Sequence, residues 1–225
     1  MAVQHPPKQM SDTFLLGALL AVVGGFLDAH TYLAREHVFA NAQTGNMVLF
    51  GLNLAEGNLR KAAAYLLPIL AFVLGVLLTE AIRSRFRASR PIHWRQIVIL
   101  IELLALAAVA FLPAPGANIF ANTLVSFICS VQVQSFRKVG GNPFATTMCT
   151  GNLRSACEQF CRFRQTRDPA ALHSSLQYCG IILFFIAGAV LGAVLTHWYA
   201  QRAALFSCAL LAAVFALMFL RREVL

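Results

Sequence analysis

Six stretches of the chain are apolar and close to the length of about 20 residues that a helix needs to cross a lipid bilayer. They cover residues 14–33, 62–82, 97–112, 117–136, 174–196 and 203–220. The third stretch is short and ends at Pro113. This pattern predicts an all-α integral membrane protein with six transmembrane helices.

Basic residues indicate how these helices are oriented and whether two polar stretches between them also cross. The two stretches cover residues 38–55 and 143–160 and are too short or too polar to be clear spans. With six crossings and a cytoplasmic N-terminus, 14 Lys and Arg residues lie inside and 4 outside. If both stretches also crossed, the split would be about 8 to 9, with Arg154 in the membrane. Because basic loops prefer the cytoplasm, we expect six crossings, two cytoplasmic termini, and two re-entrant or broken segments on opposite sides.

Two short sequences occur twice along the chain and suggest an internal repeat. Thr-Gly-Asn occupies 44–46 and again 150–152, which is 106 positions later. VLGVLLT at 73–79 and VLGAVLT at 190–196 agree at five of seven positions and are 117 apart. Apolar sequences can also echo one another by chance. The order and spacing nevertheless favour two related halves, each with one Thr-Gly-Asn segment.

The predicted halves cover residues 14–112 and 113–220, between cytoplasmic tails at 1–13 and 221–225. Each half has three crossings, and because three is odd, the second half must be inverted relative to the first. Inverted repeats with broken helices are typical of secondary transporters. The sequence therefore predicts two inverted three-helix repeats, each with a broken or re-entrant Thr-Gly-Asn segment.

Composition agrees with a membrane protein and excludes several other classes. Hydrophobic residues make up 59% of the chain and charged residues 12%, whereas soluble domains are about 25% charged. The net charge of +9 comes from basic residues between the apolar runs, which favours membrane topology over nucleic-acid binding. The six cysteines show no CxxC or Cys/His ligand spacing. We therefore expect no metal, no cofactor and no catalytic residues.

Two stretches resemble the signatures of a known family. Residues 24–52 read GGFLDAHTYLAREHVFANAQTGNMVLFGL, and residues 131–152 read VQVQSFRKVGGNPFATTMCTGN. The first is similar to the G-F-x-D-A and F-x-x-N-x-T-G-N pattern of the YoaK family of bacterial membrane proteins, and the second to its T-T-x-x-T-G-N pattern. Family members often read G-M-Q-N-A where this chain reads SVQVQ at 130–134. The resemblance covers nearly the whole chain and implies a multi-pass inner-membrane protein with two related halves. It implies no established activity.

An acidic residue inside the first predicted helix is the leading candidate for a functional group. Asp28 lies about two-thirds along residues 14–33, and a charge in hydrocarbon costs at least about 2.5 kcal/mol. Two interpretations follow. Asp28 faces a polar cavity, where it titrates or holds a cation, or it lies near the outer surface and pairs with His30 or Arg35.

The Thr-Gly-Asn segments and their polar neighbours supply further candidates for substrate binding. Glycine frees the backbone, and Thr and Asn supply hydrogen-bond donors and acceptors. Two such loops entering from opposite sides would meet near the midplane and form a small polar site. The alternative is a turn or a helix N-cap at the interface. The candidates are Asn41, Thr44, Gly45, Asn46, Thr146, Thr147, Thr150, Gly151 and Asn152.

The fourth predicted helix carries a polar stripe. Asn122, Ser126, Ser130 and Gln134 are spaced by four and lie along one face of the helix. At the offset of 106, Gln134 falls opposite Asp28 in the repeat. Such a stripe faces either a water path, as part of the candidate site, or a neighbouring helix that it binds by hydrogen bonds.

These observations predict a small secondary transporter or facilitator of an unidentified small solute or ion in the bacterial inner membrane. Asp28 would be the proton or cation carrier. The alternative is a non-transporting membrane scaffold or sensor, which binds a partner or anionic lipid through the basic segment 154–167. An intramembrane enzyme is the weakest hypothesis, because no nucleophile–base pair stands out. The expected partners are the bilayer and the solute, without nucleic acid, and the GxxxG step at Gly188 and Gly192 would allow close packing within the fold or in a homo-oligomer.

Overall fold

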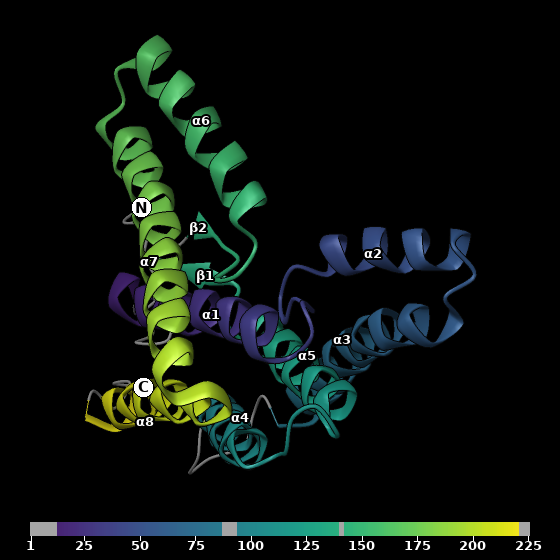
Figure 1. The fold of residues 1–225 in the computed structure, drawn as a ribbon. Helices are drawn as coiled ribbons and strands as arrows, with labels where there is room; N and C mark the ends of the chain where they lie inside the picture. Colours follow the sequence, from purple (N-terminus) through teal and green to yellow (C-terminus); the bar gives the residue numbers. More distant parts are fainter. Residues whose placement is uncertain (1–12, 87–93, 140–141, 221–225) are drawn as a thin grey trace.

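A computed structural model describes residues 13–86, 94–139 and 142–220 and consists almost entirely of helices (Figure 1). The predicted tails, apart from Thr13, and residues 87–93 of the arginine-rich loop lie outside the described residues. In chain order the elements are α1 (Phe14–Ala34), α2 (Gln43–Ala55), α3 (Leu59–Phe86), α4 (Trp94–Ala110), α5 (Asn118–Ser135), β1 (Lys138–Val139), β2 (Asn142–Pro143), α6 (Cys149–Thr166), α7 (Pro169–Tyr199), the 3₁₀-helix η2 (Ala200–Ala203) and α8 (Ala204–Leu220).

The expectation of an all-α chain is confirmed, since only the short β1–β2 hairpin interrupts the helices in the described part. A helix occupies each of the six predicted stretches. By length and composition, residues 14–34, 59–85 and 169–218 of the described chain qualify as membrane spans, and the last range contains both α7 and α8. The structure thus supports a membrane protein, in which α4, α5 and α8 have 17, 18 and 17 residues and are shorter than α1, α3 and α7.

Capping residues fix where two of the helices begin, α7 and α1. Asp168 caps α7 by accepting a hydrogen bond from the Ala170 N–H at 3.0 Å, and Pro169 occupies the first helical position. Proline suits that position because its missing N–H would have had no partner there. As a result α7 begins at residue 169 and not at 174. At α1, Thr13 Oγ1 accepts from the Leu16 N–H at 3.4 Å.

The molecule has two arms that rise from a common base (Figure 1). Helix α2 packs against α3 in one arm, and α6 packs against α7 in the other. Helices α4 and α8 pack against each other in the base, where α4 also contacts α5 and α8 also contacts α1. The main core lies among α1, α4, α5 and α8 and includes the fully buried Leu20, Ile99, Leu106, Ile128 and Leu211.

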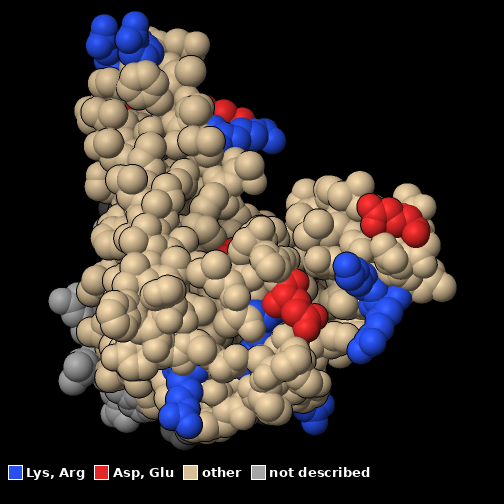
Figure 2. All heavy atoms as spheres, viewed as in Figure 1, with Lys and Arg blue, Asp and Glu red and all other residues tan. Residues whose placement is uncertain are grey.

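The surface is apolar where a soluble protein would be polar. On α3, Leu70, Leu74 and Leu77 are each more than half exposed, as are Leu183 and Val190 on α7. On the face in Figure 2, charged side chains gather at the tips of the arms and around the base, and below its basic tip the arm formed by α6 and α7 shows one acidic and basic pair on its side and is mostly uncharged elsewhere. Exposed apolar area of this extent matches contact with lipid.

The arms join the base through two close helix crossings. A Cβ atom on Gly188 of α7 would collide with the Val22 carbonyl of α1, and one on Gly75 of α3 would collide with Ser130 of α5. Small residues are therefore required at both crossings. The GxxxG step in α7 packs within the fold, against Val22 and Phe26 of α1. These two crossings belong to the α1–α7 and α3–α5 contacts.

Candidate functional site

After α1 the chain turns back along the helix that it has just left. Asn41 donates its backbone N–H to Asp28 Oδ1 at 2.7 Å and its side-chain Nδ2–H to the Gly24 carbonyl at 3.0 Å. Gly24 is the middle residue of the 21-residue α1. At 1.5 Å per residue it lies about 15 Å from the end of the helix. Helix α2 therefore begins at the depth of the middle of α1.

The segment after α5 reaches the same place. Gln132 donates its Nε2–H to Thr146 Oγ1 at 3.4 Å and to the Leu20 carbonyl of α1 at 3.2 Å. The methyl group of Thr147 lies against Gly24, where an added Cβ atom would collide with it. Asn41 and Thr147 thus contact the same residue from the two segments. The structure brings the two Thr-Gly-Asn segments together at the middle of α1.

The asparagine of each Thr-Gly-Asn motif makes the same pair of hydrogen bonds. Asn46 Oδ1 accepts from the Phe39 N–H at 3.2 Å, and Asn46 Nδ2 donates to the Phe39 carbonyl at 2.8 Å. Asn152 Oδ1 accepts from the Ala145 N–H at 3.4 Å, and Asn152 Nδ2 donates to the Ala145 carbonyl at 2.6 Å. Both asparagines are buried. Each holds the residue seven positions earlier, so the motif fixes an extended segment against the first turn of the following helix.

The threonines and glycines of the motifs lie at the N-termini of α2 and α6. A cavity of about 910 Å³ opens between these termini and the two arms. Thr44, Thr150 and Gly151 line it and are not buried, unlike the asparagines. Its remaining lining is mostly apolar and comes from α1, α3, α7 and the two segments: Asp28, Ala29, Tyr32, Leu33, Phe39, Asn41, Ala42, Gln43, Met47, Ile69, Phe72, Val73, Thr147, Met148, Cys149, Phe185 and Ala189.

Asp28 reaches this cavity and does not pair with either of the residues proposed as its surface partners. It is 8% exposed, and its hydrogen bond is to Asn41. His30 Nδ1 lies 3.0 Å from Thr196 Oγ1 of α7. Arg35 is fully buried and donates to the carbonyls of Val109 and Leu112 and to Asn118 Oδ1. The interpretation in which Asp28 pairs with His30 or Arg35 is therefore wrong.

Arg35 has a structural position that the sequence did not reveal. Its guanidinium lies at 2.9 and 3.0 Å from the carbonyls of Val109 and Leu112 at the C-terminal end of α4, where the helix dipole is negative. Asn122 Nδ2 donates to the Arg35 carbonyl at 2.7 Å. Arg35 therefore joins the ends of α1, α4 and α5. It is buried within the fold, although the topology argument counted it among the four basic residues outside.

The polar stripe of α5 does not line the larger cavity. Asn122 lines a second cavity of about 790 Å³ at the junction of α1, α3 and α5. Ser126 is buried without a hydrogen-bond partner among the described residues, and Ser130 donates to the Phe127 carbonyl at 2.7 Å. Gln134 donates to Glu80 of α3. The residues of the stripe therefore lie in three different places: at the second cavity, within the helix packing and beside Glu80. This corrects the expectation that the stripe forms one face of the site.

Gln132, and not Gln134, contacts the segment that precedes the second Thr-Gly-Asn motif. Helices α1 and α5 end at Ala34 and Ser135, which are 101 positions apart, and not 106. The second connection is five residues longer because it contains the β1–β2 hairpin. The predicted pairing of Asp28 with Gln134 depends on the repeat and stays a prediction, and an alignment by the helix ends would instead place Cys129 opposite Asp28. Gln132 continues the buried row of Val125 and Cys129, and a polar residue in such a row is the pattern that could have revealed it.

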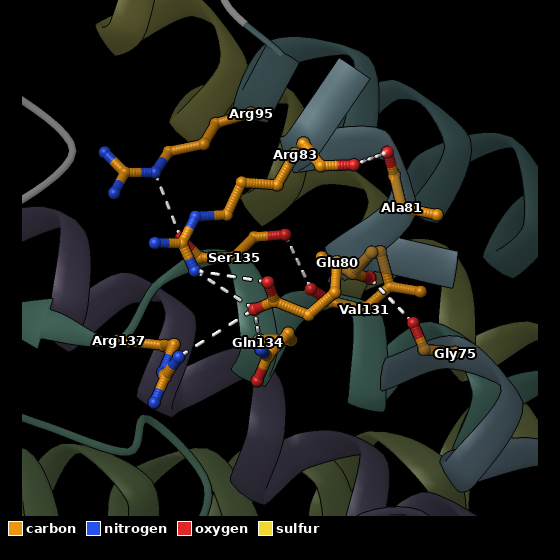
Figure 3. Close-up of polar contacts among 11 residues, drawn as sticks. Gly75, Glu80, Ala81, Arg83, Arg95, Val131, Gln134, Ser135 and Arg137 are labelled. Carbon is orange, nitrogen blue, oxygen red and sulfur yellow. Dashed lines mark hydrogen bonds and ion pairs between the residues drawn. The ribbon is translucent and has the colours of Figure 1, made fainter. Parts of the chain in front are cut away.

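Gln134 belongs to a polar cluster that joins the ends of α3 and α5 to the start of α4 (Figure 3). Glu80 is the centre: Arg83 Nη1 lies 3.0 Å and Arg137 Nη1 3.8 Å from its Oε1. Arg95 Nε donates to the Ser135 carbonyl at 3.0 Å. The Glu80 side chain is 45% exposed, and ion pairs with this exposure stabilise a protein by less than about 1 kcal/mol each.

Metal binding finds no support in the described residues, where no three His, Cys, Asp or Glu side chains cluster closely enough to hold an ion. All six cysteines are free thiols. Cys149 lines the cavity at the first position of α6. The site therefore offers one carboxylate, two helix N-termini, several hydroxyl and amide groups, and aromatic walls.

Comparison with known proteins indicates a family but no activity. Residues 16–217 match the model of a family described as "Protein of unknown function (DUF1275)". The chain is 25% identical over 186 residues to the UPF0700 transmembrane protein YoaK of Bacillus subtilis (strain 168), which covers 79% of this chain and 81% of that relative. No solved structure matches. The resemblance seen in the sequence motifs is confirmed.

Proposed function

Because this chain belongs to the DUF1275 family, whose activity is unknown, we propose its function from the cavity itself: it is a small secondary transporter or facilitator of a small solute or ion. One observation carries this proposal. Two helices with identical N-terminal clamps begin at the middle of α1 and border one cavity that contains a carboxylate. Broken helices whose N-termini meet at membrane depth, at the interface of two repeats, are how many transporters build their substrate sites.

The packing of the helices supports two inverted repeats, α1–α4 and α5–α8. Exchanging the halves turns the α1–α7 contact into α5–α3, the α2–α3 contact into α6–α7, and the α4–α5 contact into α8–α1. The contact between α4 and α8 maps onto itself. In this proposal α1, α3, α4, α5, α7 and α8 cross the membrane, and α2 and α6 are re-entrant from opposite sides.

The same topology puts 14 basic residues on one side of the membrane and 4 on the other. The side rich in basic residues is then the cytoplasm, and both termini lie there. Under this proposal the membrane is the bacterial inner membrane. The basic tip of the α6–α7 arm and the cluster around Glu80 both lie on the cytoplasmic side.

Transport would follow from motion of the two arms. Each arm contributes one wall of the cavity, Phe72 from α3 and Phe185 from α7. Each arm also crosses the base at a close glycine contact, about which it can tilt without unpacking a layer of large side chains. Rocking of one half against the other would expose Asp28 first to one side and then to the other.

Cys149 provides a native reporter for this motion. A variant that keeps Cys149 and replaces the other five cysteines with alanine is treated with a membrane-impermeant maleimide in right-side-out and in inside-out vesicles. Alternating access predicts that Cys149 reacts from both sides. A variant that keeps only Cys208, whose Sγ packs 3.7 Å from the Leu103 carbonyl between α4 and α8, is the control and is expected to react from neither. Reaction of Cys149 from a single side would contradict transport.

A further inference from the structure

The two helix N-termini that border the cavity differ in their electrostatic surroundings, and this difference bears on the class of ligand. Both helices lack a side-chain cap and an acidic residue in the first turn. A helix N-terminus carries the equivalent of about half a positive charge. Near α2 that charge has a neighbour of opposite sign, since Asp28 accepts the N–H of Asn41, two residues before the helix. Among the described residues, no carboxylate accepts a hydrogen bond from the segment before α6.

The hydrogen-bond acceptors of the site lie on the α1 side of the cavity. Asp28 contributes a carboxylate of which Oδ1 is bound to the Asn41 N–H. Asn41 is only 4% exposed, and its Oδ1 has no hydrogen-bond partner among the described residues, although its Nδ2 donates to Gly24. A buried amide oxygen without a donor costs free energy unless something binds to it. Asp28 and Asn41 together suit a group with several N–H donors, such as an ammonium.

The free hydrogen-bond donors lie at the N-terminus of α6, which belongs to the other segment. The first amides of a helix have no partners within it, and Met148 supplies no side-chain cap there. Thr150 and Gly151 are exposed at the cavity, and no atom lies within 4 Å of the place that a Gly151 Cβ would take. A helix start with open access and free N–H groups binds carboxylates and other anions.

Aromatic side chains form the walls between these two ends. Tyr32, Phe39, Phe72 and Phe185 line the cavity, whose volume is about 910 Å³. The charges of the site nearly cancel, because one carboxylate opposes two half-charges at the helix termini. A neutral ligand with one positive and one negative end matches this balance better than a simple cation or anion.

We propose that the ligand is a small zwitterion with an apolar or aromatic body. Its ammonium would bind Asp28 and Asn41, its carboxylate would bind the first amides of α6, and its body would lie among the aromatic walls. This inference rests on the proposed function only in assuming that the cavity is a substrate site.

The test uses the full chain in detergent and three probes that share one aromatic body. L-Phenylalanine has both charges, 3-phenylpropionate has only the carboxylate, and 2-phenylethylamine has only the ammonium. A ligand that binds only the folded state raises Tm by mass action. Because a charge-assisted hydrogen bond contributes about 1.5–3 kcal/mol, we expect L-phenylalanine to bind at least about tenfold more tightly than either analogue.

Two variants test which part of the site binds the ammonium and which binds the carboxylate of the ligand. Asp28→Asn should remove the advantage of L-phenylalanine over 3-phenylpropionate. Cys149→Pro removes one amide N–H at the first helical position, which proline tolerates. This variant should remove the advantage of L-phenylalanine over 2-phenylethylamine while leaving the binding of 2-phenylethylamine unchanged. The inference is overturned if no probe raises the Tm of the wild type, or if an analogue with one charge matches L-phenylalanine. If either outcome is found while Cys149 still reacts from both sides of the membrane, only the proposed ligand class is wrong. If Cys149 reacts from one side, transport itself fails.

Discussion

The two Thr-Gly-Asn segments share one clamp but are tied to the preceding helix by different chemistry. Asn46 and Asn152 make equivalent hydrogen bonds. The first segment is then anchored by a carboxylate, Asp28, and the second by an amide, Gln132. The second anchor demonstrates that a neutral side chain is sufficient to hold such a segment. A carboxylate is costly to bury, so the charge of Asp28 is more than the anchor requires, which supports the proposal that Asp28 acts in ligand binding.

The largest effects on folding are expected at the two glycine crossings, where substitutions in the two halves should have the same consequence. Gly188→Val places side-chain atoms inside the backbone of α1 at Val22, and Gly75→Val places them against the Ser130 hydroxyl and the Phe127 carbonyl of α5. Both should cost about 3 kcal/mol or more and prevent folding, because the helices cannot separate without losing their contact. The measurement is the yield of monodisperse protein by size-exclusion chromatography. Gly51→Ala is the control, since nothing lies within 4 Å of its added Cβ. A well-folded Gly188→Val protein would contradict the close crossing.

The next largest losses of stability are expected at the two asparagine clamps, Asn46 and Asn152. Asn46→Ala and Asn152→Ala each leave one backbone N–H and one carbonyl without partners. Each should lower the free energy of unfolding by about 2–4 kcal/mol, and the two losses should be similar. Thermal unfolding in detergent measures both. If one variant is strongly destabilised and the other is not, the two segments are not equivalent and the repeat loses its main support.

Substitutions at the two anchors, Gln132 and Asp28, should have different consequences, the first for stability and the second for ligand binding. Gln132→Ala removes hydrogen bonds to Thr146 and Leu20 and should cost about 1–2 kcal/mol. Asp28→Asn keeps an oxygen that accepts the Asn41 N–H, so it should change stability by less than about 1 kcal/mol. Only Asp28→Asn should abolish the Tm shift caused by L-phenylalanine. An Asp28→Asn protein that unfolds like Gln132→Ala and still responds to the ligand would reverse this assignment.

The smallest effect is expected at the tip of the α6–α7 arm. Arg164 and Arg167 are exposed, so replacing both with glutamine should change stability by less than about 0.5 kcal/mol. It should also leave the labelling of Cys149 unchanged. The scaffold hypothesis makes the opposite prediction, since it needs these charges to bind a partner or anionic lipid. Loss of co-purified anionic phospholipid in the double variant, with Cys149 unreactive from one side, would favour the scaffold.

The positions of the helices and of the paired motifs could be predicted from the sequence because they depend on local patterns. Apolar runs near 20 residues placed all six long helices, and Thr-Gly-Asn identified both segments. The partners of Asp28 could not be predicted in this way. Asn41 is 13 residues away and meets Asp28 only because the chain turns back along α1.

The winding of α5 explains why its polar stripe was predicted to share one surrounding. A spacing of four residues drifts around a helix with 3.6 residues per turn, so the stripe from Asn122 to Gln134 leaves the buried face. Gln132 remains on it. Under the proposed repeat, the β1–β2 hairpin also makes the α5–α6 connection five residues longer than the α1–α2 connection. Hairpins in connections leave no periodic pattern that would reveal such a difference.

The central claim is that both Thr-Gly-Asn segments face a single cavity that opens to each side in turn. Thr44→Cys and Thr150→Cys occupy matching positions at the starts of α2 and α6. In a background without other cysteines, each is exposed to a membrane-impermeant maleimide in right-side-out and inside-out vesicles. The account predicts that both positions react from both sides and that L-phenylalanine protects both. If Thr44→Cys reacts from one side only and Thr150→Cys only from the other, the segments lie in two separate clefts and the claim is wrong.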